Sequence, residues 1–250
     1  MAGRLENRKA LVTGGSRGIG AAIATAFAAE GADVAFCHDD DPEGAAAVAA
    51  AIQRHDRRAL AVQCDVADDA AARRFWDDAE CALGPIEILV NNAGIGGERA
   101  FEAIDLATFD RMIAVNLRAL FHFAKLAAPG MRARRWGRIV NIASQLAYKG
   151  AAGLTHYCAA KAGVVGFTRA LALELAIDGV LVNAIAPGMT ETRLGDGLTD
   201  DWKARKLSEL PIRRFGVPNE IAPTAVLLAS SDGDFYVGQT LSPNGGDVFL

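Results

Sequence analysis

The stretch Thr13-Gly14-Gly15-Ser16-Arg17-Gly18-Ile19-Gly20 lies near the start of a 250-residue chain and decides its fold. It follows an apolar run at 9–13 and precedes an Ala-rich segment at 18–29 with a helical composition. Glycine at positions 14, 18 and 20 permits a tight turn and a close approach to the backbone. Free N–H groups at the helix start can then face a pyrophosphate. The stretch predicts a dinucleotide-binding strand–turn–helix unit, with contacts from Gly14, Ser16, Arg17, Gly18, Ile19 and Gly20.

Short apolar runs alternate with longer helical segments along the rest of the chain, which indicates repeated strand–helix units. The runs are apolar throughout, as expected for a parallel sheet covered by helices on both faces. We see no linker or compositional shift, and we predict one domain over 1–250: an α/β Rossmann fold with a doubly wound, seven-stranded parallel sheet. The strands are expected at 9–13, 33–37, 59–63, 86–91, 138–143, 180–186 and 238–242, and two long helices at 107–128 and 155–176.

Composition and charge exclude several function classes. Apolar residues make up 51% of the chain, enough for a large core, so disorder is excluded. The 26 Lys and Arg residues against 30 Asp and Glu residues leave a charge of −4, which disfavours a nucleic-acid partner. Neither the four cysteines nor the four histidines have ligand spacing, so we expect no metal site and reduced, buried thiols. With no apolar leader or membrane-length run, we expect a soluble, cytoplasmic protein without a membrane partner.

Further motifs follow the later strands. They are Asn91-Asn92-Ala93-Gly94, Asn116, Ser144, Tyr157-x-x-x-Lys161, Pro187-Gly188 and Asn244-Gly245-Gly246. Together with the glycine-rich turn, these motifs resemble the short-chain dehydrogenase/reductase family over nearly the whole chain. The similarity is greatest to the branch that holds β-ketoacyl carrier-protein reductases and many polyol and sugar dehydrogenases.

The resemblance implies a set of cofactor contacts beyond the first turn. They are Asp65, Val66, Asn92, Ala93, Gly94, Pro187, Gly188, Thr190 and Thr192, together with Tyr157 and Lys161. It also implies that the segment at about 189–210 covers the substrate; a surface connection is the alternative interpretation of that segment.

The sequence favours NAD(H) over NADP(H). Asp39 lies 19 residues beyond Gly20, where a carboxylate commonly binds the ribose 2′-OH and repels a 2′-phosphate. Arg17 argues for NADP(H), because it resembles a residue that binds this phosphate. The acids at 39–43 are also explained by a helix start, with Asp41 as the N-cap and Pro42 as the first helical residue.

Four residues are candidates for catalysis. Tyr157 and Lys161 are four apart on an expected helix and share one face, so the ammonium can lower the pKa of the phenol. Ser144 would hydrogen-bond the substrate oxygen, and Asn116 resembles a residue that holds a water next to Lys161. Each residue also has an ordinary structural interpretation, such as a surface pair, a turn serine or a mid-helix polar residue.

We therefore predict an oxidoreductase that transfers a hydride between nicotinamide and a secondary alcohol or ketone, with Tyr157 as the general acid and base. A small polyol, sugar or hydroxy compound is the favoured substrate, because Asp178 stands where a base that docks an acidic carrier protein is expected. The alternatives are a 3-oxoacyl-thioester reductase, a sugar-nucleotide epimerase and a non-enzymatic NAD(P) sensor. The resemblance implies a homotetramer that buries the face of 155–176 and the apolar end Val248-Phe249-Leu250.

Overall fold

The computed structural model describes residues 3–193 and 199–249. One seven-stranded parallel sheet runs through the molecule, as predicted. The strand order is β3-β2-β1-β4-β5-β6-β7. The strands are β1 (Lys9–Val12), β2 (Asp33–His38), β3 (Ala59–Gln63), β4 (Ile88–Asn91), β5 (Gly137–Ile142), β6 (Val180–Ile185) and β7 (Thr240–Leu241).

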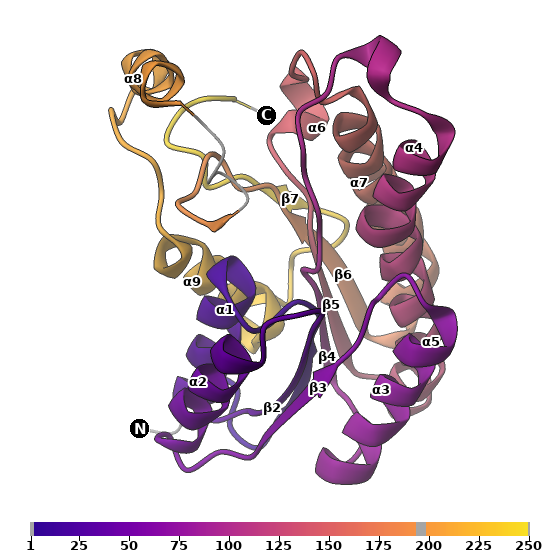
Figure 1. The fold of residues 1–250 in the computed structure, drawn as a ribbon. Helices are drawn as coiled ribbons and strands as arrows, with labels where there is room; N and C mark the ends of the chain where they lie inside the picture. Colours follow the sequence, from indigo (N-terminus) through magenta and orange to yellow (C-terminus); the bar gives the residue numbers. More distant parts are fainter. Residues whose placement is uncertain (1–2, 194–198, 250) are drawn as a thin grey trace.

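Helices lie on both faces of this sheet (Figure 1). The helices are α1 (Gly18–Ala29), α2 (Pro42–Gln53), α3 (Asp69–Leu83), α4 (Leu106–Ile113), α5 (Ala119–Arg134), α6 (Leu146–Lys149), α7 (Thr155–Leu175), α8 (Asp200–Glu209) and α9 (Pro218–Ala229). Helices α1, α2 and α9 cover one face, and α3, α5 and α7 cover the other. Helices α6 and α8 lie with the C-terminus at the top of Figure 1.

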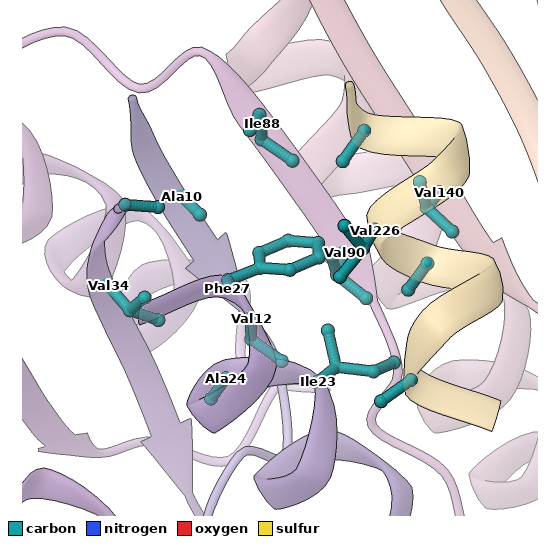
Figure 2. Close-up of a cluster of buried hydrophobic side chains, with 14 of the residues drawn as sticks. Ala10, Val12, Ile23, Ala24, Phe27, Val34, Ile88, Val90, Val140 and Val226 are labelled. Atoms are coloured by element: carbon teal, nitrogen blue, oxygen red, sulfur yellow. The ribbon is translucent and has the colours of Figure 1, made fainter. Parts of the chain in front are cut away.

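A buried apolar cluster joins the first face of the sheet to its helices (Figure 2). Phe27 and Ile23 of α1 point between the strands and α9, where they meet Val90 of β4 and Val226 of α9. Alanines along α1 and α9 let the helices lie close to each other and to the sheet, because their side chains are small. This packing fixes the start of α1, and with it the glycine-rich turn, against the end of β1.

The expected helix over 107–128 is divided into three parts. Residues Ala114–Arg118 form a π-helical turn between α4 and α5. The amide Nδ2 of Asn116 donates to the carbonyl oxygens of Met112 and Ile95, both at 3.1 Å. A π turn widens the helix by one residue, and such turns occur frequently at functional sites. No glycine or proline within the turn signals it in the sequence.

Two smaller expectations are corrected. The last strand comprises only Thr240–Leu241, although Gly238 and Gln239 also hydrogen-bond to the backbone of β6. The thiols are not all buried: Cys37 and Cys64 are, whereas Cys81 is exposed and Cys158 is half-buried. Cys81 lies on the solvent side of α3, whose buried face carries Phe75 and Ala79.

Candidate active site

The glycine-rich turn connects β1 to α1 and is held from the side by the loop after β4. Gly14 and Gly18 have φ values of 67° and 56°, in the left-handed region that favours glycine. A Cβ on Gly20 would lie 2.2 Å from the Gly14 carbonyl oxygen, so no larger residue fits there. The Asn92 amide donates to the carbonyl oxygens of Thr13 and Gly14, both at 2.9 Å. Asn92 therefore shapes the turn.

Thr13 is a site residue that the motif analysis did not single out. Its buried hydroxyl accepts hydrogen bonds from the backbone N–H groups of Asn92 and Ala93, both at 3.0 Å. The only sequence signal was a polar residue at the end of an otherwise apolar strand. Thr13 locks two loops together, so that Ala93 and Gly94 lie beside the turn.

Other proposed cofactor contacts are placed around the same turn. A Cβ on Gly18 would lie 3.2 Å from a side-chain carbon of Thr192, which brings the loop after β6 over the start of α1. The hydroxyl of Thr190 donates to the Gly188 carbonyl oxygen at 3.0 Å and is buried. Residues 194–198 of the expected covering segment lie outside the described residues.

Asp65 and Val66 follow β3 at the expected position. Val66 is buried, and a carboxylate oxygen of Asp65 accepts from Nη1 of Arg111 at 2.8 Å. That ion pair ties the end of β3 to α4. Asp68 caps α3 by accepting from the N–H groups of Ala70 and Ala71.

Among the acids after β2, it is Asp41 and not Asp39 that lies beside the glycine-rich turn. Asp39 is exposed, and its carbonyl oxygen accepts from the Gln63 side chain at 2.8 Å. The carboxylate that faces Arg17 belongs to Asp41, at 3.6 Å, and Asp41 precedes α2 as the predicted N-cap. Burial alone would raise the pKa of Asp41. Hydrogen bonds from the Ser16 hydroxyl and the Gly44 N–H, together with the positive charges of Arg17 and Arg193, outweigh this effect, so the pKa lies below its usual value. Asp41 is therefore charged, and its carboxylate lies beside Ser16 and Arg17 of the glycine-rich turn.

Ser144, Tyr157 and Lys161 come together at the carboxyl end of β5. Ser144 follows this strand, and Tyr157 and Lys161 lie on the buried face of α7. The Lys161 ammonium donates to the carbonyl oxygen of Ile142, the last residue of β5, at 2.9 Å. It lies 5.8 Å from the centre of the Tyr157 ring. All three side chains are buried or nearly so.

Burial determines how this group titrates. It raises the pKa of Tyr157 to about 12, and the neighbouring Ser144 hydroxyl acts in the opposite direction. It lowers the pKa of Lys161 to about 8. The expected lowering of the Tyr157 pKa by Lys161 is not found: burial is the largest cause of the shift, and the ammonium is directed at a backbone carbonyl. At neutral pH, Tyr157 is therefore an un-ionised phenol, and the neighbouring Lys161 is a cation.

Asn116 lies across a small cavity from Lys161. Both residues line it, together with Thr13, Asn91 and Ala93. The Oδ1 atom of Asn116 is buried and has no hydrogen-bond partner within the described residues. A Cβ on Gly94 would lie 2.8 Å from this oxygen and 3.6 Å from Nζ of Lys161. This oxygen is free to accept a hydrogen bond, and its position shows why residue 94 lacks a side chain.

These features fit a dinucleotide. The glycine turn presents backbone at a helix N-terminus, and side chains are excluded at 14, 18, 20 and 94 by φ or by close contact. We infer that Gly14 to Gly20 would hold the pyrophosphate, and that Lys161 with Tyr157 would lie at the nicotinamide end. Within residues 3–193 and 199–249, no helix is long and apolar enough to cross a membrane.

Comparisons with known proteins agree with this arrangement. The family model for short chain dehydrogenase matches residues 8–203. A 3-oxoacyl-[acyl-carrier-protein] reductase of Vibrio harveyi is 41% identical over 97% of this chain and 98% of its own length.

Two solved structures have nearly the same fold. A blue fluorescent protein from a metagenomic library, in complex with NADPH, is 37% identical with a TM-score of 0.92, covering 98% of this chain and 100% of that one. The second is a protein from Beutenbergia cavernae that is provisionally described as an NAD(P) dependent gluconate 5-dehydrogenase and was solved with NADP at low occupancy. It is 37% identical with a TM-score of 0.92, covering 97% of each chain. The chain belongs to the short chain dehydrogenase family and is an NAD(P)-dependent oxidoreductase acting on alcohol and carbonyl groups.

Proposed function

We propose that this protein reduces 3-oxoacyl thioesters with a nicotinamide cofactor. The likeness to the Vibrio harveyi reductase over almost the whole of both chains carries this proposal. It reverses the preference for polyols and sugars, which rested on the charge of Asp178.

The charge argument against an acidic carrier loses its force in the folded protein. Asp178 accepts from Nε of Arg132 at 2.6 Å and lies 3.9 Å from Nη1 of Arg135. Its side chain is 21% exposed, whereas those of the two arginines are 54% and 70% exposed. An acidic partner would therefore meet two guanidinium groups around one neutralised carboxylate, a net positive surface.

The residues at the carboxyl end of β5 supply what the reduction needs. The bound cofactor supplies a hydride for the carbonyl carbon. Ser144 hydrogen-bonds the carbonyl oxygen, and Tyr157 transfers its proton to that oxygen as negative charge develops there. Lys161 supplies a buried cation 5.8 Å from the centre of the Tyr157 ring, and Asn116 holds a water through which a proton returns. We assign catalysis to these four residues.

We further propose that the cofactor is NAD(H), even though two similar structures contain NADPH or NADP. Asp39, Asp40, Asp41 and Glu43 gather after β2, and Arg17 is already paired with Asp41. A 2′-phosphate carries up to two negative charges and would be repelled by the acids and meet an arginine that is engaged elsewhere.

Reduction of acetoacetyl-CoA, followed at 340 nm with NADH and NADPH in parallel, tests both proposals. We expect turnover with a higher kcat/KM for NADH. Absence of turnover with either cofactor, while both bind by fluorescence titration, contradicts the thioester proposal. Oxidation of gluconate or another polyol with NAD⁺ by the same preparation would then support the second candidate function, which the Beutenbergia cavernae protein favours.

A further inference from the structure

The carboxylate of Asp247, near the C-terminus, is surrounded by three donors from two other parts of the chain. Its Oδ1 accepts from the ammonium groups of Lys149 and Lys206, both at 2.8 Å. Its Oδ2 accepts from the side-chain amide of Gln145 at 2.6 Å. The Asp247 side chain is 6% exposed. Both carboxylate oxygens are thus occupied by charged or buried partners.

The three donors come from elements with different roles. Gln145 directly follows Ser144, and Lys149 ends the short helix α6 that begins there. Lys206 belongs to α8, within the segment expected to cover the substrate. Helices α6 and α8 approach the C-terminal segment from opposite sides at the top of Figure 1. Asp247 is therefore the point at which the covering helix meets the Ser144 turn.

The loop that carries Asp247 is itself fixed to the cofactor side of the site. The N–H of Gly188 donates to the Pro243 carbonyl oxygen at 3.0 Å, and the N–H of Gln145 donates to the Pro187 carbonyl oxygen at 3.1 Å. A Cβ on Gly188 would lie 2.6 Å from Cα of Asn244. The loop after β6, the Ser144 turn and the C-terminal loop form one packed unit.

Helix α8 is held to this unit by few contacts. None of its residues is fully buried, so it contributes little to the hydrophobic core. The Lys206 side chain is nevertheless only 11% exposed, and its other ionic neighbour is Glu209 of the same helix, at 3.3 Å. Both side chains of the Lys206–Asp247 ion pair are largely buried, so removing one partner is more disruptive than at an exposed pair, where water screens the charges.

We propose that Asp247 is a positioning residue that couples the covering helix to the catalytic turn. Through Lys206 it holds α8 against the C-terminal loop, and through Gln145 it holds the turn that carries Ser144. Lys206 and Gln145 bind separate oxygens of this one carboxylate, so the link to α8 can be removed without removing the link to the Ser144 turn. The kinetic part of this inference rests on the proposed role of Ser144, whereas the tether itself does not.

Three variants separate the tether from the loss of a charge. Lys206→Gln removes the bond from α8 to Asp247. Lys149→Gln is the matched control, because it removes a bond of equal length to the same oxygen and leaves α8 attached. Asp247→Asn weakens the bonds to both Lys206 and Gln145. Lys206→Arg keeps the positive charge on α8 and serves as the conservative variant.

Amide hydrogen exchange of the whole protein, measured without substrate, is the first readout. We expect exchange at 200–209 to accelerate at least several-fold in Lys206→Gln and Asp247→Asn, and to stay near that of the parent in Lys149→Gln and Lys206→Arg. Exchange at 144–149 should accelerate in Asp247→Asn. Equal exchange at 200–209 in Lys206→Gln and Lys149→Gln would overturn the proposed tether.

Steady-state kinetics on acetoacetyl-CoA give the second readout. We expect Lys206→Gln to raise KM several-fold with little change in kcat, and Asp247→Asn to raise KM and lower kcat, since only the second variant disturbs the Ser144 turn. Unchanged kcat in Asp247→Asn, with exchange at 144–149 also unchanged, would overturn the link to Ser144. A parent protein that reduces no thioester contradicts the proposed substrate alone, because the exchange experiment needs none.

Discussion

Arg132 and Asp178 form an ion pair across the turn that precedes β6, with Nε of the arginine 2.6 Å from the carboxylate. The two residues are 46 positions apart. The arginine neutralises an acid that would otherwise repel an acidic partner. Because Arg135 also lies nearby, the net charge of this surface is positive.

The first prediction concerns Asp178→Asn. Removing the carboxylate leaves Arg132 and Arg135 unpaired and adds one positive charge to this surface, which speeds encounter with an acidic partner. We expect kcat/KM for a 3-oxoacyl group on an acyl carrier protein to rise a few-fold at low salt. An uncharged N-acetylcysteamine thioester is the control and should be reduced at the parental rate. An equal change for both substrates would argue against carrier contact at this surface.

The second prediction concerns Tyr157→Phe, which removes the phenolic proton and little else. We expect kcat to fall by about 10²–10⁴, the usual contribution of a positioned general acid. Cofactor binding, followed by fluorescence, should be close to that of the parent. Turnover at the parental rate would exclude Tyr157 as the proton donor.

The third prediction concerns Lys161 and the pH dependence of stability. Burial lowers its pKa from 10.5 to about 8 in the folded chain. Between these two pH values the unfolded chain binds more protons than the folded chain, so the free energy of unfolding rises with pH. Below about pH 8 the folded chain bears the full energetic cost of holding a buried ammonium. The total gain is about 3 kcal/mol at most.

Chemical denaturation of the parent and of Lys161→Met tests this prediction. The methionine variant cannot titrate, so the parent should become more stable relative to the variant as pH rises from about 8 to 10.5. A difference that is independent of pH would show that Lys161 keeps its ordinary pKa.

The fourth prediction concerns Asp41→Asn. Loss of this carboxylate releases Arg17, from which it lies 3.6 Å away, and removes one negative charge beside the proposed ribose site. We expect the ratio of kcat/KM for NADPH to that for NADH to increase several-fold. Asp40→Asn is the control, because Asp40 is exposed and makes no ion pair within the described residues. A larger shift in the control would place the selective charge elsewhere.

The fifth prediction is the homotetramer. Leu173 near the end of α7 is 83% exposed, and Ile177 just beyond this helix is 78% exposed. Phe249 near the C-terminus is 89% exposed, and such exposure is unusual for large apolar side chains. Light scattering should give a mass of four times 26.2 kDa. Leu173→Arg should lower that mass, and a parent protein that is already monomeric contradicts the prediction.

Features that depend on neighbouring residues were the most predictable from sequence. The helix 18–29 was predicted with the bounds that α1 has, because a glycine-rich turn and an alanine run define its start and its course locally. Strands β2 and β3 likewise match their apolar runs to within one residue. The spacing of Ser144, Tyr157 and Lys161 also led to residues that the structure brings together.

Features that depend on distant side chains could not be predicted. Whether Arg17 faces Asp39 or Asp41 is decided by the course of the chain after β2. Asp178 meets Arg132 only because parallel β5 and β6 bring the preceding turns side by side. Asp247 gave no signal of its own, since its partners at 145, 149 and 206 are scattered along the chain.

The π-helical turn at Ala114–Arg118 also affects how the gene can vary. The turn holds one residue more than an α-helical turn, so deleting one codon within it would restore an ordinary α-helix. Phe123, Ala127 and Met131 of α5 would keep their orientation toward the core they fill. Packing of the next helix therefore does not preserve the wide turn. What the turn determines is the position of Asn116, whose amide reaches the carbonyl oxygen of Ile95.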